Sequence, residues 1–136
     1  MSDTIFSDQG VLSTPILIAL VTLKGYQEYR HGNSVYIEDL AGYLAKLKKK
    51  GVNIKSIALS RTLDKYWSDD VAQFVSDGLV FGFLTHNSPL QFDERRCLEV
   101  CKNAILGEVG DNEQLQKAFN EAREALELEP FETLAA

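Results

Sequence analysis

The sequence predicts an α+β fold that is mostly helical, and two patterns support this prediction. Apolar residues recur at positions i, i+3, i+4 and i+7 between Leu40 and Leu47, which places them on one face of a helix. An apolar and aromatic run, residues 79–84, is followed by a loop and a short return at residues 90–92, which is typical of a β-hairpin. The chain has 136 residues, of which 45% are hydrophobic, so it is long enough for one domain with its own core.

The N-terminal part is expected to contain one long buried helix. Residues 1–12 are expected to form a flexible lead-in. Thr14 and Pro15 mark the helix start, since threonine can cap free backbone N–H groups and proline at the first position loses no needed donor. The residues from Ile16 to Leu23 are apolar on nearly every side, so this helix should be buried within its domain or at a dimer interface.

A second and a third helix are expected next. A very short strand at residues 35–37 leads into a helix at about 38–50, with acidic residues in its first turn and lysines in its last. After a connector, Ser60 is the candidate cap of a helix that reaches about Ser76. Residues 59–76 form either one helix or two, because Ser and Asp at 68–70 prefer caps to helix interiors.

The C-terminal part is expected to contribute a hairpin and two helices. Gly78 should end the third helix. Asp93 should cap a helix at about 94–106, and Asp111 with Gln114 resembles a capping box before a last helix at about 112–128. The expected organisation is a lead-in at 1–12, a main domain at 13–107 and a C-terminal amphipathic helix at 111–129 for dimerisation or docking.

The order of elements over residues 14–92 resembles that of winged helix-turn-helix domains. Residues 37–41 open the second helix, and Phe74–Val80 closes the third with the Gly-Leu-Val that begins a wing. The resemblance implies a winged-helix core with a small β-hairpin and additional C-terminal helices. The connector Gly51–Leu59 is longer than the three or four residues usual in this family, so either a small helix is inserted or the helices pair differently.

The charge is distributed unevenly. The net charge of −6 argues against a uniformly basic nucleic-acid binder. Between Leu44 and Tyr66, however, seven basic residues stand against Asp64 alone, a local charge of about +6 that leaves about −12 for the rest of the chain. This asymmetry points to an anionic partner, with a solvated lysine face as the simpler alternative.

The resemblance implies a regulator of transcription that binds double-stranded DNA. Its third helix would begin at Ser60 and would place its first residues against base edges in the major groove. Arginine is the residue type that pairs bidentately with guanine, whereas lysines bind phosphates without reading sequence. The implied contacts are Ser60, Arg61, Thr62 and Lys65 at the bases, Lys46, Lys49, Lys50 and Lys55 at phosphates, and His86, Asn87 and Ser88 at the wing tip.

The alternative is a protein-interaction or assembly subunit with the same fold. Asp64, Asp69 and Asp70 would repel phosphate, and the wing tip holds no Arg or Lys. The N- and C-terminal helices offer more apolar surface than a small core needs, so we expect a homodimer or a protein partner through one or both of them.

Other residues carry weaker indications. Cys97 and Cys101 lie on one helical face and could bind a metal with His31 or His86, although buried cysteine is common as a core residue. Tyr66, Trp67 and Phe74 are expected in the core, with a ligand pocket as the alternative. Adjacent carboxylates, Glu38-Asp39 and Asp69-Asp70, point apart on a helix and fit caps or surface charge better than an acid/base pair.

The sequence predicts a non-enzymatic protein without a cofactor. It contains neither a Gly-rich phosphate loop nor a Gly-x-Ser-x-Gly elbow. The apolar run from Pro15 to Leu23 is too short to cross a bilayer, and the acidic start lacks the basic residues of a secretory signal. The expected location is the cytoplasm.

Overall fold

The computed structural model describes residues 10–55, 57, 59–62 and 65–135. It is α+β and mostly helical, with two small antiparallel hairpins, as the sequence predicts. In chain order the elements are α2 (Thr14–Arg30), α3 (Ile37–Lys49), β1 (Ser60–Thr62), β2 (Lys65–Trp67), α4 (Asp69–Phe81), β3 (Leu84–Asn87), β4 (Leu90–Phe92), α5 (Glu94–Val109), α6 (Glu113–Leu126) and α7 (Phe131–Ala135).

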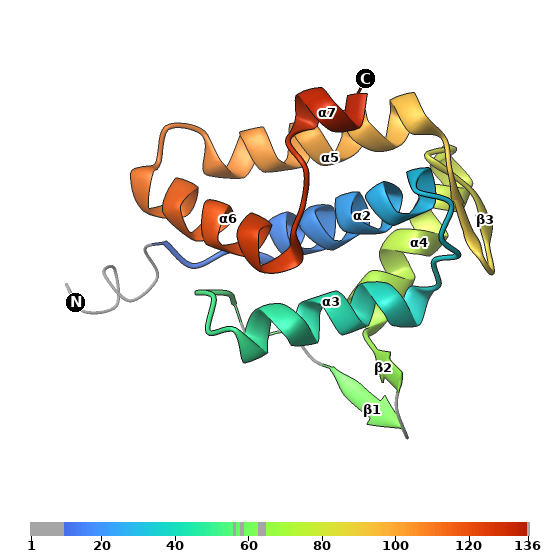
Figure 1. Cartoon of the computed structure of the whole chain (residues 1–136), viewed down its shortest axis with the longest axis horizontal. Helices are drawn as coiled ribbons and strands as arrows, with labels where there is room; N and C mark the ends of the chain where they lie inside the picture. Colours follow the sequence, from blue (N-terminus) through green and yellow to red (C-terminus); the bar gives the residue numbers. More distant parts are fainter. Residues whose placement is uncertain (1–9, 56, 58, 63–64, 136) are drawn as a thin grey trace.

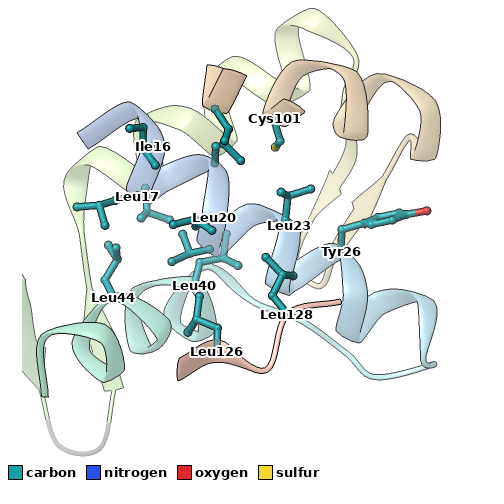
Figure 2. Packing of buried hydrophobic residues seen from close by; sticks show 14 of the residues in the cluster. Ile16, Leu17, Leu20, Leu23, Tyr26, Leu40, Leu44, Cys101, Leu126 and Leu128 are labelled. Atoms are coloured by element: carbon teal, nitrogen blue, oxygen red, sulfur yellow. The ribbon is translucent and has the colours of Figure 1, made fainter. Parts of the chain in front are cut away.

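Helix α2 is the centre of the fold. It contacts α3, α4, α5 and α6, and Figure 1 shows it between α5 on one side and α3 on the other. Leu17, Leu20 and Val21 are completely buried, and each such side chain stabilises the fold by roughly 1.5–3 kcal/mol. In Figure 2 the leucines of α2 meet Leu40 of α3 and Leu128 near the C-terminus. Helix α2, which is apolar on nearly every side, is therefore enclosed by other helices of the same chain.

Helix α3 confirms the predicted second helix. Its inward face carries Leu40, Leu44 and Leu47, all fully buried, as the spacing predicts. The predicted strand at residues 35–37 is replaced by the helix start, because Asp39 Oδ2 accepts a bond of 2.9 Å from the backbone N–H of Tyr36. Val35 still connects to the second hairpin, since its carbonyl accepts a bond of 2.6 Å from the backbone N–H of Leu90.

The region predicted as the start of the third helix is a hairpin instead. Strands β1 and β2 pair antiparallel, with Ser60 opposite Trp67 and Arg61 opposite Tyr66. Tyrosine, tryptophan and threonine favour strands, and a short apolar run cannot be assigned to helix or strand by spacing alone. Ser60 is thus a strand residue, and the cap of α4 is Ser68, whose Oγ accepts a bond of 3.2 Å from the backbone N–H of Val71.

Helix α4 passes through Gly78 and ends one turn later than predicted. Gly78 is buried, and a Cβ there would lie 2.7 Å from Phe83 Cε2, so this position needs glycine for close packing and not for a helix end. The helix ends at Gly82, whose φ of 86° is the left-handed conformation common after a helix. The predicted strand 79–84 therefore shrinks to β3, which pairs with β4 as expected.

The C-terminal segment packs back onto α2. Gln27 is buried, and its Nε2 donates to the Glu127 carbonyl at 3.0 Å while its Oε1 accepts from the Glu129 backbone N–H at 2.6 Å. Arg30 Nη1 donates to the Thr133 carbonyl at 2.9 Å, and His31 Nε2 lies 3.0 Å from Glu129 Oε1. These contacts fix the path between α6 and α7 across the end of α2, as Figure 1 shows.

The helix ends near the C-terminus differ slightly from the prediction. Asp93 caps α5 as predicted, since its Oδ1 accepts a bond of 3.0 Å from the backbone N–H of Arg96. The cap of α6 is Asn112 instead of Asp111, because its Oδ1 accepts from the backbone N–H groups of Gln114 and Leu115 at 3.0 and 3.1 Å. The described part of the predicted lead-in is partly structured, since Leu12 is fully buried and forms a parallel bridge with Ile54.

The order α2, α3, α4 and β3–β4 agrees with the order expected of a winged helix, but the hairpin β1–β2 stands between α3 and α4. The strand pair follows the connector Gly51–Leu59 and occupies residues predicted to begin the third helix, and the described residues of the connector, 51–55, 57 and 59, form no helix. The α+β, mostly helical class is confirmed, whereas the winged-helix assignment remains a prediction.

Two glycines in helices test the packing around α2 with the same substitution. A Cβ on Gly25 would lie 2.6 Å from Leu40 Cδ2, whereas a Cβ on Gly42 would meet nothing within 4 Å. We expect Gly25→Ala to lower the free energy of unfolding by about 1–2 kcal/mol through overpacking, in spite of its better helix propensity. Gly42→Ala should raise it by up to about 1 kcal/mol. Urea unfolding measures both, and equal effects would contradict the packing described for α2 and α3.

Candidate interaction surfaces

The predicted base-reading residues lie on the hairpin β1–β2 and not on a helix. Figure 1 shows this hairpin at the edge of the molecule on the side of α3, and β2 contacts α3. Ser60, Arg61 and Lys65 are exposed, and the Arg61 guanidinium lies over the Tyr66 ring, 5.4 Å from its centroid. Asp64, which was expected to repel phosphate, lies outside the described residues. The register pairs Arg61 with Tyr66 and Thr62 with Lys65, so Arg61 and Lys65 lie on opposite faces of the hairpin and not on a recognition helix.

The remaining lysines lie elsewhere. Lys46, Lys49 and Lys50 are exposed at the C-terminal end of α3, and Lys55 is exposed in the connector. Lys65 instead borders a groove at the other half of α3, about two turns or 10 Å along the helix. The groove has a volume of about 460 Å³ and is lined by Tyr36, Glu38, Asp39, Gly42, Tyr43, Lys65 and Tyr66. Because Lys65 faces two carboxylates there, the predicted basic residues do not form one uninterrupted phosphate-binding face.

Two tyrosines, Tyr43 in this groove and Tyr26 in the core, have raised pKa values. Burial, followed by the charges of Asp39 and Glu28, raises the pKa of Tyr43 to about 12. In the core, burial and the Glu94 carboxylate likewise raise the pKa of Tyr26 to about 12. Both phenols therefore stay neutral and act as apolar rings with a polar end.

Helix α4, which would read DNA in a winged helix, carries only negative charge. Asp69 and Asp70 are exposed in its first turn, Asp77 is half-buried, and the sequence of α4 contains no Lys or Arg. The tip of the second hairpin, with His86 and Asn87 exposed, adds no formal positive charge when histidine is neutral. Phosphate would be repelled from α4, the helix that stands third in the order expected of a winged helix.

The end of α4 presents the most exposed large apolar side chains of the described residues. Val80 is 77% exposed and Phe81 is 72% exposed. Beside them lies a groove of about 470 Å³ between the end of α4, the start of β3 and α5. Its lining residues, which define what we call the α4–α5 groove, are Phe81, Phe83, Arg96, Glu99, Val100 and Asn103.

The walls of the α4–α5 groove are held in place by local packing. Phe83 is buried, and its ring lies 5.1 Å from that of Phe74, centroid to centroid. The Arg96 side chain crosses the backbone of Gly82, where a Cβ would lie only 2.5 Å from Nη1, so a side chain at that position would displace the guanidinium. Within the part of the chain that the structure describes, Arg96 forms no ion pair.

A second groove lies on the other side of α5. It has a volume of about 500 Å³ and runs between α5 and α7. Its lining residues are Leu98, Glu99, Lys102, Asn103, Phe131 and Glu132. Glu99 and Asn103 border both grooves, so the exposed side of α5 is a ridge between them.

The cysteine pair belongs to the core. Cys97 and Cys101 are completely buried, and Figure 2 shows Cys101 within the leucine cluster. A hydrogen bond with the Cys97 thiol, together with burial, raises the pKa of Cys101 well above its usual value. Among residues 10–135, apart from the gaps in the description, we find no group of three or more potential metal ligands. The structure thus favours the core interpretation over a metal site for these thiols.

The carboxylate pairs serve local structure. Asp39 caps α3, and Asp69 Oδ1 accepts a bond of 3.0 Å from the indole N–H of Trp67. Trp67 itself is 39% exposed, so it is not the core residue that the sequence predicts. Asp39 therefore has the capping role expected of it, whereas α4 is capped by Ser68 and Asp69 bonds to the Trp67 indole.

The surfaces expected to mediate dimerisation are buried within the chain. The apolar face of α6 carries Ala118, Ala122 and Leu126, all buried, and α6 contacts α3 and α2. Helix α2 is enclosed as described above. The apolar faces from which we expected a homodimer are therefore covered by the chain's own helices, and a homodimer remains a prediction.

Sequence reasoning did not find the α4–α5 groove. The apolar and aromatic content of residues 79–84 predicts a strand, so the exposure of Val80 and Phe81 was not predicted. A helical continuation from Val71 and Val75 to Gly78 places Val80 and Phe81 off the buried face. The helical spacing of Val71, Val75 and Gly78 was the feature of the sequence from which the exposure of Val80 and Phe81 could have been predicted.

Comparisons with known proteins identify no family for this chain. The sequence matches no family model, no curated protein and no solved structure. Among the described helices, none is both long and apolar enough to cross a membrane.

The burial of the two cysteines predicts how they react. In the native protein neither thiol should react with Ellman's reagent on the time scale of an exposed cysteine, because both are inaccessible and the pKa of Cys101 is raised. Both should react at once in urea. Absorbance at 412 nm, about the usual wavelength for the released thiolate, gives the rates. Rapid reaction under native conditions would show that α5 is not packed as described.

Proposed function

We propose that this chain is a non-enzymatic protein-interaction module that docks a partner protein in the α4–α5 groove. The observation that carries the proposal is Phe81, a large aromatic side chain that is 72% exposed at the edge of that groove. Exposed apolar side chains are common singly, but here Phe81 and Val100 line one depression, and the exposed Val80 precedes Phe81 in the chain.

The composition of the groove supports a protein partner. The centre of a protein–protein interface is typically aromatic and apolar, with Arg enriched and polar groups at the rim. The α4–α5 groove combines Phe81, Phe83 and Val100 with Arg96, Glu99 and Asn103. Its aromatic and arginine residues are the types that most often carry binding energy.

The electrostatics of α4 also support protein over DNA as the ligand of this face. The helix carries three aspartates and no cation. Binding to DNA depends on neutralising phosphates with Lys and Arg, which this helix lacks. An assembly subunit of this kind needs no active site, in agreement with the prediction of a non-enzymatic protein.

A matched pair of substitutions tests the proposal. A photo-crosslinking residue at position 100 should first identify the partner in extracts of the source cells. The purified partner is then titrated calorimetrically against Phe81→Ser and Leu106→Ser. Leu106 is a suitable control, because it is 56% exposed on the same α5 yet outside the groove lining.

We expect Phe81→Ser to weaken binding by roughly 30-fold, the loss of about 2 kcal/mol typical of an anchor residue. Leu106→Ser should change the affinity by less than about threefold. Both variants should melt near the native temperature, since both side chains are exposed. Equal affinities for the two variants would refute docking in the α4–α5 groove.

A second candidate function is binding of nucleic acid by the hairpin β1–β2. The observation that favours it is that each face of this strand pair combines a basic with an aromatic residue, Arg61 with Tyr66 on one face and Lys65 with the partly exposed Trp67 on the other. Two-stranded ribbons can enter the major groove of DNA, and aromatic side chains beside basic ones can stack on unpaired bases. Double-stranded DNA and a role in transcription remain proposals on this basis.

The salt dependence of binding tests the second candidate. The native chain should bind random-sequence DNA more weakly as salt increases, and Arg61→Ala/Lys65→Ala should reduce the slope of log K against log salt by roughly two. Lys102→Ala/Lys117→Ala makes the same charge change on α5 and α6 and serves as control. Fluorescence anisotropy with labelled duplex and single strand measures this. Absence of binding at low salt, or equal slopes for both double variants, would exclude the hairpin as a nucleic-acid site.

A further inference from the structure

We infer that the segment docked in the α4–α5 groove is apolar and carries a carboxylate, which Arg96 binds. This inference rests on the proposed docking function and adds the chemistry of the partner. It depends on the position of Arg96, on the charged groups around it and on the length of the groove.

Arg96 is a cation at the edge of an apolar depression. Its guanidinium lies over Gly82, and Phe81, Phe83 and Val100 form the apolar part of the same groove. Among the described residues no carboxylate pairs with it. The planar guanidinium can bind a carboxylate through two parallel hydrogen bonds, a geometry that matches the two carboxylate oxygens.

The position of Arg96 has a structural explanation as well. A cation near the C-terminal end of α4 interacts favourably with the carbonyl groups of its last turn. That interaction uses the charge of Arg96 but not its fork of N–H groups, since no side-chain hydrogen bond from Arg96 occurs between described residues. The donors therefore remain available to a ligand.

The charges around the groove orient the ligand. Glu99 lies on the same helix one turn after Arg96, and Asn103 lies one turn further. A carboxylate is attracted to the Arg96 end and repelled from Glu99, whereas the amide of Asn103 can accept or donate. The partner segment should thus place its carboxylate near Gly82 and its N–H groups near Glu99 and Asn103.

The groove is short. From Arg96 to Asn103 the helix rises about 10 Å. This length matches about three residues of an extended peptide or two turns of a helix. We therefore expect one apolar anchor and one acidic residue a few positions apart, and not a long charged stretch.

Peptide selection on the full chain tests this inference. A displayed library of random peptides, each flanked by Gly-Ser at both ends, is selected separately on the native chain and on Phe81→Ser. The random part has about 12 residues, so that it is longer than the groove. We expect native-specific peptides to share an aromatic or aliphatic residue and an Asp or Glu. The strongest peptide is then synthesised together with its amide version, Asp→Asn or Glu→Gln.

The two synthetic peptides separate the inference from the proposed function. On the native chain the amide version should bind at least tenfold more weakly, and on Arg96→Gln the two should bind within about twofold of each other. Arg96→Lys should restore part of the preference. The comparison on the native chain needs no folded variant, so it remains decisive even if Arg96→Gln is unstable.

Three results would overturn the inference in distinguishable ways. If both peptides bind the native chain equally, the carboxylate preference is wrong but docking in the groove stands. If no peptide distinguishes the native chain from Phe81→Ser, both the inference and the proposed function fail. If sedimentation shows that the native chain self-associates and Phe81→Ser does not, the occupant is a second copy and not a carboxylate-bearing partner.

Discussion

The structure depends on the need to enclose one helix on every side. Helix α2 is apolar around most of its circumference, and leaving any face in water would cost roughly 1.5–3 kcal/mol for each large side chain. The other helices can be understood as the walls of this enclosure. They come from regions far apart in the sequence, since α3 and α5 contact α2 on different sides and the C-terminal residues Leu128 and Leu134 complete the cover. Gly25 allows the closest of these approaches, at Leu40.

This enclosure determines which surfaces remain for function. The apolar faces of α3, α5 and α6 are packed toward α2, so their outer faces are polar. The exceptions lie in the last turn of α4 and on α5, where Val80, Phe81 and Leu106 are not needed by the core. The hairpin β1–β2 is also outside the enclosure, which explains how it can carry exposed aromatic and basic residues at little cost to stability.

The sequence was informative where burial and periodicity agree. The α+β class, the helix with Leu40 and Leu44 on its inner face, the Asp93 cap and the hairpin β3–β4 could all be predicted. Residues 60–67 could not, because three-residue strands leave too few positions to separate a period of two from one of 3.6. That single error moved the proposed recognition helix, and with it Arg61 and Lys65, onto the wrong element. The α4–α5 groove depends on the tertiary position of α5 beside α4, which no local pattern encodes.

The hydrogen bonds between α2 and the C-terminal segment have a consequence for how the protein is made. Gln27 and Arg30 bond to residues 100 to 104 positions later in the chain. A ribosome synthesises α2 early, so its apolar surface must wait for α5, α6 and the last cover from Leu128 and Leu134. At a synthesis rate of about 5–20 residues per second this interval lasts several seconds. During it the apolar surface of α2 is exposed, and exposed apolar surface of this kind is what chaperones bind. The same long-range closure that gives the folded protein its stable centre thus leaves α2 incompletely covered until residues 127–134 have been synthesised.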